Sequence, residues 1–452
     1  MTLRTLVMCA ALTFAAPAIA AAEHSPTPAP VPTALPTQLS LSDAENIAIA
    51  QSPLLALARA VVAQAQSQTD LAQSAALPNL SGQASSTHSK SSFRNAGGTG
   101  GTGGTGGAGS SAGIFTENLA TLNLRQLVFD GGHVRAQVLA ARYSTDAARL
   151  QLERQVQTVV FSVAQDYFQA LQARHQLQAA LDSLRLAQSQ EKLVEAQYRT
   201  GAAARADVLT AQLPVAQAQL AVAQAQNGER QQIAGLLNAM GLPSNVKVTL
   251  KDDTSISGNV PGADAVLAIA QTSRPDLLAA RATLQSTMQS VHAAELQRVP
   301  QISANASDGV ESIVPGASSF GNSYSVGVSM QVPIFDGGVI RAQTEGARAQ
   351  QATAQANERT SELGVTQTVE QAYLGLLTAQ AGLTSATAEL SQARTVLDVT
   401  NAQYKAGVTT LPLLLNAQVG LTKAETDYAV ALYAFKIAQQ NLLFAEGTIG
   451  KT

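Results

Sequence analysis

Residues alternate with a period of two in several stretches of the chain, which together predict four β-strands; the weakest, at 79–92, alternates small with polar residues. The clearest stretch is 322–335, where Tyr324, Val326 and Val328 lie on one face and serine and glutamine residues on the other. The other strands are expected at about 79–92, 118–129 and 301–312. Each has about ten residues, the length that crosses a bilayer when a strand is tilted. Soluble hairpins with one wet face are the alternative interpretation.

Two much longer stretches are rich in Ala and Gln and carry helical spacing. The first, 132–198, has no proline and no glycine beyond its first residue, and would be on the order of 100 Å long. The second, 338–404, is equally long, and shorter return helices are expected at 203–241 and 411–445. We expect each return helix to stack end to end on a short upstream helix. The resulting rods are too long for a globular domain and must project from it.

The chain is a tandem duplication. Phe129-Asp130-Gly131-Gly132 recurs as Phe335-Asp336-Gly337-Gly338, at an offset of 335 − 129 = 206, and Tyr198-x-x-Gly201 recurs as Tyr404-x-x-Gly407. At each Asp-Gly-Gly a strand is expected to turn directly into a helix, because glycine supplies the backbone freedom and aspartate caps the first turn. These six residues are the predicted strand-to-helix switches.

Upstream landmarks fix the boundaries of the two repeats. Pro53 matches Pro275 and Pro78 matches Pro300 at an offset of 275 − 53 = 222, so the first copy carries 222 − 206 = 16 extra residues. The low-complexity tract Gly97–Gly109 accounts for the insertion and is expected at a loop tip. We therefore divide the chain into repeat 1 (39–243), a linker (244–262), repeat 2 (263–446) and a short polar tail (447–452).

The first residues direct export. Arg4, an apolar run and the small residues Ala18-Ile19-Ala20 predict a signal peptide over 1–22, followed by an extended Pro-rich leader over 23–38. The single cysteine, Cys9, lies inside the signal, so the mature chain is expected to have no disulfide and no lipid anchor. Because no later stretch has 18 or more apolar residues, membrane insertion is expected to use the strands.

Composition and candidate chemistry argue against several functions. Aromatic residues make up 4% and charged residues 13%, which suits thin helix–helix interfaces rather than a thick core. A net charge of −3 without a basic block gives no case for nucleic acid. The histidines lack metal-ligand spacing, the Gly-Thr tract lacks the Lys-Ser/Thr of a phosphate loop, and Asp166 is expected to be solvated or to face a lumen. We expect no enzyme activity, no metal and no cofactor.

The strand count predicts an oligomer. Four strands cannot close into a barrel, and an open sheet edge is not viable in lipid. We therefore expect an α+β membrane protein in which a homotrimer forms a twelve-stranded β-barrel, four strands per chain, continued by a long α-helical barrel. Membrane lipid would surround the strands, and the small polar residues would face a passage.

The helical turns far from the strands are the candidate functional tips. Tyr198, Gly201 and Arg205, with Asp207, lie at one tip, and Tyr404, Lys405 and Gly407 lie at the other. They are either ordinary helix–helix turns or a gate and a docking surface, because a tube narrows or meets a partner at its end.

The duplicated Phe-Asp-Gly-Gly switch, Tyr198-x-x-Gly201 with Asp207-Val208-Leu209, and Tyr404-x-x-Gly407 with Asn416-Ala417-Gln418 resemble the TolC-like outer membrane efflux protein family. The resemblance covers nearly all of the chain after the leader. It implies a trimer in the cell outer membrane, a helical barrel in the periplasm, a periplasmic adaptor (membrane fusion) protein and an inner-membrane pump. It also implies that the tip residues Tyr198, Gly201, Arg205, Lys405 and Gly407 dock the adaptor.

The resemblance implies a periplasmic aperture as well. In the best-known member a Tyr, an Arg and two Asp hold it closed; Tyr404 matches the Tyr, whereas Thr409 stands at the Arg position and Leu413 and Asn416 stand at the Asp positions. The aperture candidates here are these four residues with Asp207. A closure by Leu413 and Asn416 would be only weakly sensitive to pH and cations.

Three functions remain open. The leading one is a passive exit duct for small toxic solutes or drugs, driven by the pump through the adaptor. The second is the outer-membrane channel of a type I protein secretion system. The third, from another class, is a periplasmic coiled-coil adaptor or structural rod.

Overall fold

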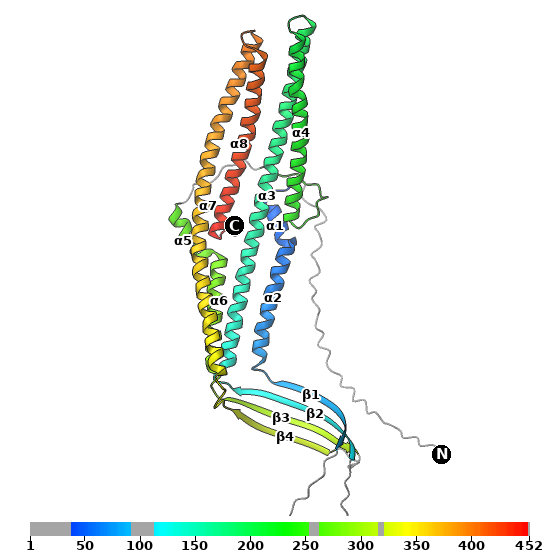
Figure 1. The fold of residues 1–452 in the computed structure, drawn as a ribbon, viewed down its shortest axis with the longest axis vertical. Coiled ribbons are helices and arrows are strands. Elements are labelled where there is room, and N and C mark those ends of the chain that lie inside the picture. Colours follow the sequence, from blue (N-terminus) through cyan, green and yellow to red (C-terminus); the bar gives the residue numbers. More distant parts are fainter. Residues whose placement is uncertain (1–37, 92–112, 253–261, 315–320, 451–452) are drawn as a thin grey trace, which may run out of the picture.

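The computed structural model describes residues 38–91, 113–252, 262–314 and 321–450, which form two similar helix–strand–helix units. Figure 1 shows two long helical hairpins with free tips at one end and a four-stranded sheet at the other. The first unit contains α1 (Leu41–Gln51), α2 (Pro53–Ser74), β1 (Asn79–Ser91), β2 (Gly113–Phe129), α3 (His133–Arg199) and α4 (Arg205–Ala239). The second contains α5 (Ala263–Ser273), α6 (Pro275–Leu296), β3 (Gln301–Val314), β4 (Gly321–Gln331), α7 (Val339–Lys405) and α8 (Leu411–Glu446).

Both long helices, α3 and α7, have 67 residues and run uninterrupted from the sheet to the tips (Figure 1). At 1.5 Å per residue each is about 100 Å long. The tip turns follow Gly201 and Gly407, whose φ values are +78° and +71°. Glycine is required there because the left-handed backbone that ends these helices is costly for other residues.

The shorter helices stack end to end, as expected from their lengths. Gly241, just after α4, sits so close to the α1–α2 break that a Cβ there would lie 2.8 Å from the Gln51 carbonyl oxygen. Gly447, just after α8, sits equally close to the α5–α6 break, where a Cβ would lie 2.9 Å from Arg274 Cα. Figure 1 accordingly shows α4 in line with α2, and α8 in line with α6.

The four strands form one antiparallel sheet in the order β1-β2-β3-β4. The register aligns Gly82, Leu122, Asp308 and Tyr324 across the sheet, so residues of equal parity share a face up to the register shift between Leu127 and Phe129. On one face Tyr324 and Val326 are 84% and 81% exposed, and the opposite face is rich in Ser and Asn. Along the outer edges of β1 and β4, the described residues have no strand partner within the chain.

Several strand boundaries differ from the sequence prediction. The strand expected over 322–335 ends at Gln331, because Pro333 cannot donate to a ladder and the following residues lead into the Gly337 turn. The strand expected from 118 begins at Gly113, since its extra residues pair with β1. The tail is not wholly polar in its packing, because Ile449 is only 4% exposed. The predicted signal peptide, nearly all of the leader and the Gly-Thr tract lie outside the described residues.

The main core lies at mid-height, where α1, α3 and α8 meet the described part of the linker. Leu39 and Leu250 form a parallel bridge and are almost fully buried. The Tyr433 hydroxyl donates to Asp252 Oδ1 at 3.0 Å, and His175 Nε2 lies 2.6 Å from Asp252 Oδ2. Burial first, and then the Asp252 charge, raises the pKa of Tyr433, so its hydroxyl stays a donor. The linker is therefore fastened to both long hairpins.

Within the described ranges, no single helix is both long and apolar enough to cross a membrane. The consecutive helices α1 and α2, bent by 46° relative to each other, meet the length and composition criteria only as a pair.

Candidate functional site

The two strand-to-helix switches have the same geometry. Asp130 Oδ1 accepts from the Gly132 N–H at 2.9 Å and its Oδ2 from the Val134 N–H at 2.6 Å. Asp336 receives the equivalent bonds from Gly338 and Ile340 at 3.0 and 2.7 Å. These backbone hydrogen bonds lower the pKa of Asp336. Each carboxylate thus satisfies free N–H groups in the first turn of a long helix.

The glycines of the switches have left-handed backbones but different surroundings. Gly131 and Gly337 have φ values of +67° and +64°, and the Gly132 and Gly338 values are also positive. A Cβ on Gly131 would lie 2.3 Å from Val299 Cγ1, whereas a Cβ on Gly337 would meet nothing within 4 Å. The first switch therefore packs tightly against Val299, three residues after the end of α6, whereas the second has free space around it within the chain.

At the tips, one hydrogen bond joins the two hairpins. The Tyr404 hydroxyl, at the end of α7, donates to Gln197 Oε1, near the end of α3, at 3.3 Å. Burial first, and then the charge of Asp207, raises the pKa of Tyr404. Beneath this bond, Val194, Ala211 and Leu411 form a small buried cluster. The cluster and the hydrogen bond hold the tips together in this chain.

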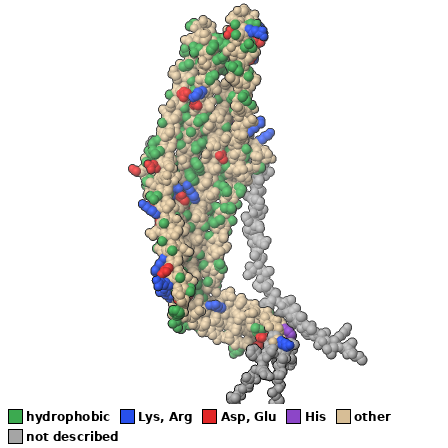
Figure 2. Space-filling model, in the orientation of Figure 1, with side chains coloured by type: hydrophobic (Ala, Val, Ile, Leu, Met, Phe, Trp, Pro, Cys, Tyr) green, Lys and Arg blue, Asp and Glu red, His purple; other side chains and the backbone are tan. Residues whose placement is uncertain are grey.

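The other predicted tip residues are mostly exposed. Asp207 is engaged locally, because its Oδ2 accepts from the Ala204 N–H at 2.9 Å and caps α4. Leu413 is 51% exposed and Asn416 is also exposed, while Thr409 is half-buried in the turn before α8. The adaptor-docking candidates are all exposed: Tyr198, Gly201, Arg205, Lys405 and Gly407. Figure 2 shows basic and acidic side chains together at the α3/α4 tip.

The structure thus brings Tyr404 and Asp207 close, and leaves Leu413 and Asn416 on the surface of a single chain. Sequence reasoning missed Gln197, which is the hydrogen-bond partner of Tyr404. The repeat offered only a faint signal, since Gln197 matches Gln403 at the 206-residue offset in a helix that is already rich in glutamine.

Asp166, expected to be solvated or lumen-facing, is half-buried on α3. It lines a groove with Ser52, Asn238 and Gly241, where α4 meets the α1–α2 break. Burial raises the pKa of its carboxyl group. Its surroundings are therefore those of a helix junction.

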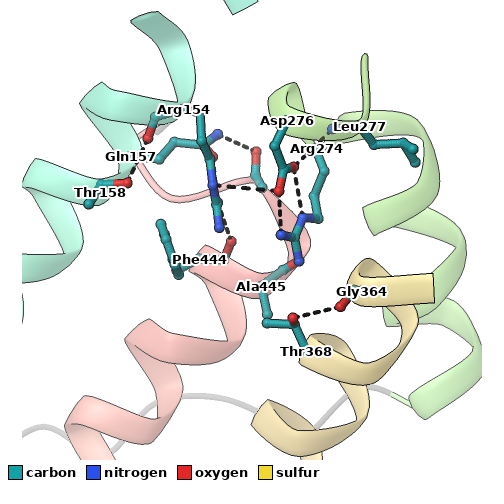
Figure 3. A network of polar contacts seen from close by, with 11 residues as sticks. Arg154, Gln157, Thr158, Arg274, Asp276, Leu277, Gly364, Thr368, Phe444 and Ala445 are labelled. Atoms are coloured by element: carbon teal, nitrogen blue, oxygen red, sulfur yellow. Dashed lines mark hydrogen bonds and ion pairs between the residues drawn. The ribbon is translucent and has the colours of Figure 1, made fainter. Parts of the chain in front are cut away.

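A charged network fastens the end of α8 at the second junction (Figure 3). Arg274 bonds Asp276 through both carboxylate oxygens, at 2.6 and 3.0 Å, and its side chain is 6% exposed. Arg154 on α3 donates to the Phe444 carbonyl at 3.1 Å and lies 3.7 Å from the centroid of the Phe444 ring. Gln157 donates to the Gly447 carbonyl at 2.7 Å. Cations and donors therefore meet the unpaired carbonyls of this helix end.

The pKa values in this network shift accordingly. Burial alone would raise the pKa of Asp276, but the hydrogen bonds and charges of Arg274 and Arg154 together lower it. Burial lowers the pKa of Arg154 to about 10, partly offset by Asp276. Both groups carry their charges at neutral pH, so the network is an ion-pair network that links α3, α6 and α8.

The described residues contain no group of three or more His, Cys, Asp or Glu side chains that could hold a metal ion. The contacts described above instead connect helices: they join the two hairpins at their tips and fix them to each other at mid-height.

Solved structures share this fold. The chain superposes on the outer membrane protein VceC of Vibrio cholerae with a TM-score of 0.73 and 21% identity, covering 90% of this chain and 96% of that one. It superposes on the outer-membrane channel OprN with a TM-score of 0.75 and 21% identity, covering 90% of each chain. The fold is thus that of outer-membrane channels.

The family description "Outer membrane efflux protein" matches residues 45–242 and 266–448, and the chain belongs to this family. Among curated relatives, "Outer membrane efflux protein BepC" of Brucella suis is 25% identical over 341 residues, 71% of each chain. "Protein CyaE" of Bordetella pertussis is 25% identical over 343 residues, 74% of this chain and 72% of that one. The protein is therefore located in the outer membrane, with its helical part in the periplasm, and belongs to a family of channel proteins.

Proposed function

We propose that this protein is the outer-membrane exit channel of a tripartite efflux system, a passive conduit for small toxic solutes or drugs. The observation that carries the proposal is the four-stranded sheet, with one strongly exposed apolar face and two edges along which the described residues have no strand partner. Backbone groups facing lipid need hydrogen-bond partners, so the edges of β1 and β4 call for neighbouring copies.

A homotrimer supplies those neighbours. Pairing β4 of one copy with β1 of the next gives a twelve-stranded barrel with the apolar face toward lipid and the Ser- and Asn-rich face toward the passage. Exposed apolar residues on the outer helices are consistent with further contacts between copies, as on α2, where Leu54 and Leu57 are 57% and 68% exposed. The helices then continue the barrel as a tube.

The channel is not an enzyme. The energy for transport and its direction would come from an inner-membrane pump. A periplasmic adaptor would dock on the exposed tips and couple the channel to an inner-membrane pump. A groove between the hairpins is lined by Pro214 and Gln217 of α4 and by Leu415 and Gln418 of α8. This groove could receive a helix of the adaptor, which supports docking at this end of the molecule. Opening on contact requires that the adaptor bind the open state better than the closed one.

The aperture would be closed at the tips by Tyr404, Thr409, Leu413, Asn416 and Asp207. Apart from Asp207, which caps its own helix, these side chains are uncharged. We therefore infer a closure that depends little on pH or on cations.

The experiment that tests the function is conductance of the purified protein in a planar bilayer. Wild-type protein is expected to give stable single channels of low conductance. Replacing Leu413→Ala together with Asn416→Ala should widen the closure and raise single-channel conductance. Unchanged conductance would remove these two residues from the gate, and no channels at all would contradict the channel itself and favour the structural rod.

A drug-susceptibility panel on a deletion strain then separates efflux from secretion. Efflux predicts hypersensitivity that the intact gene restores. A deletion strain with ordinary susceptibility but a missing secreted protein would assign the channel to type I secretion instead.

Tyr404→Phe is expected to increase the time spent open. The change keeps the ring in its packing and removes only the hydroxyl that donates to Gln197. A neutral hydrogen bond contributes about 0.5–1.5 kcal/mol, which is roughly a twofold to thirteenfold change in the open–closed equilibrium. Tyr198→Phe is the matched control, because Tyr198 is 45% exposed at the same tip. Equal gating of the two variants would show that the Tyr404 hydrogen bond does not hold the tip.

A further inference from the structure

The strand register sorts the charged side chains of the sheet onto two faces. Arg125, Glu117 and Glu311 share parity with the Ser- and Asn-rich face, whereas Asp308 aligns with Leu122 and Tyr324 on the apolar face. Lys90 aligns with Ile114, also on the parity of the apolar face. Arg125 is thus the one Lys or Arg on the polar face of the described strand residues.

Arg125 also lies apart from the acidic residues of that face. It is 129 − 125 = 4 residues from the end of β2 that joins α3, whereas Glu117 is 129 − 117 = 12 residues from it. Glu311 pairs with Leu119, on the same distant half of the sheet. The face therefore has its positive charge beside the helices and its negative charges near the outer end.

The immediate neighbours of Arg125 carry no charge. Its register partners are Asn79 on β1 and Asn305 on β3, and the Asn305 side-chain amide donates to Ser329 Oγ at 2.9 Å. Arg125 is exposed, and none of the ion pairs found among the described residues includes it. Its charge is therefore not neutralised locally.

We propose that Arg125 sets the charge preference of the passage where the strands meet the helical tube, and favours anionic over cationic solutes there. The inference rests on the proposed trimeric channel, in which three copies of Arg125 line one level of the pore. Rings of Arg or Lys are a general means of anion selectivity. Among the aperture candidates only Asp207 carries a charge, so the Arg125 ring has a measurable share in the selectivity of the whole channel.

The test is the reversal potential of the purified trimer in planar bilayers under a KCl gradient. Arg125→Glu is expected to raise the potassium-to-chloride permeability ratio at least about twofold, Arg125→Gln less, and Arg125→Lys hardly at all. Lys90→Glu makes the same charge change on the apolar face and is the matched control, with no shift expected. The effect should shrink in concentrated salt, because the Debye length falls from about 10 Å at 0.1 M to about 3 Å at 1 M.

The outcomes separate this inference from the function on which it rests. If the wild-type protein forms channels but Arg125→Glu and Arg125→Gln both keep the wild-type reversal potential, the proposed role of Arg125 is wrong and the channel function still stands. The same shift in Lys90→Glu would overturn it too, because position on the polar face would then be irrelevant. Wild-type protein without any conductance would contradict the channel. Should Arg125→Glu fail to assemble, Arg125→Gln alone decides.

Discussion

Replacing Arg274 with methionine is expected to lower the free energy of unfolding by about 1–3 kcal/mol, between the losses typical of exposed and of buried ion pairs, because Arg274 is buried while Asp276 is 37% exposed. Arg274 is 6% exposed and bonds both carboxylate oxygens of Asp276. Methionine fills much of the same space, but it leaves the Asp276 carboxylate with only the Leu277 N–H, at 3.0 Å, and the more distant Arg154 guanidinium, 3.9 Å away. Chemical denaturation in detergent, followed by the helical circular dichroism signal, measures the loss.

Arg359→Met is the matched control for this prediction. Arg359 pairs with Glu362 on α7, but the two side chains are 67% and 38% exposed. Exposed pairs of this kind contribute about 0–1 kcal/mol, so little change is expected. If the two variants lost the same stability, the junction network would be no more important than a surface pair.

Gly131→Ala is expected to destabilise the protein far more than Gly337→Ala. Both glycines have a left-handed backbone, which costs a residue with a Cβ about 1–2 kcal/mol. Only at Gly131 would the new Cβ also meet Val299, at 2.3 Å, and such overpacking costs about a further 1–3 kcal/mol. The midpoint of thermal unfolding of each purified variant compares the two switches.

A second-site change relieves part of the clash. Adding Val299→Ala to Gly131→Ala removes the two Cγ atoms, which would lie 2.3 and 3.1 Å from the new Cβ, but keeps the Cβ of residue 299, which would lie 2.8 Å away. The double variant should therefore recover part of the way toward the stability of Gly337→Ala. Strain alone, without a clash, would show as equal losses at the two glycines and no recovery in the double variant.

The repeated features of the fold could be predicted from the sequence because each depends on residues that are close together in the chain. The Asp-Gly-Gly switches at residues 130 and 336 were predicted from one motif and its 206-residue offset, and the structure gives both the same hydrogen bonds. The alternation around Tyr324 likewise predicted the apolar face of the sheet. The predicted end of that strand was wrong: the alternation continues to residue 335, but the strand ends at Gln331 because Pro333 cannot donate a backbone hydrogen bond to the sheet.

Long-range partners could not be predicted in this way. Arg154 and Arg274 belong to different repeats, and no spacing rule connects a helix interior to the break before α6. Gln197 lacks any local mark that would distinguish it from the other glutamines of α3. The roles of Leu413 and Asn416 stay predictions, because a single chain leaves both side chains exposed.

The end-to-end joints at Gly241 and Gly447 give the two sides of each hairpin different continuity. One side, α3 or α7, is a single continuous helix, while the other side is divided at mid-height into two helices that meet at a glycine. Because α4 spans about 50 Å, a tilt of about 10° at its joint would carry its far end roughly 9 Å sideways. A small rotation at the mid-height joint thus becomes a displacement on the scale of a solute molecule at the tip of the hairpin.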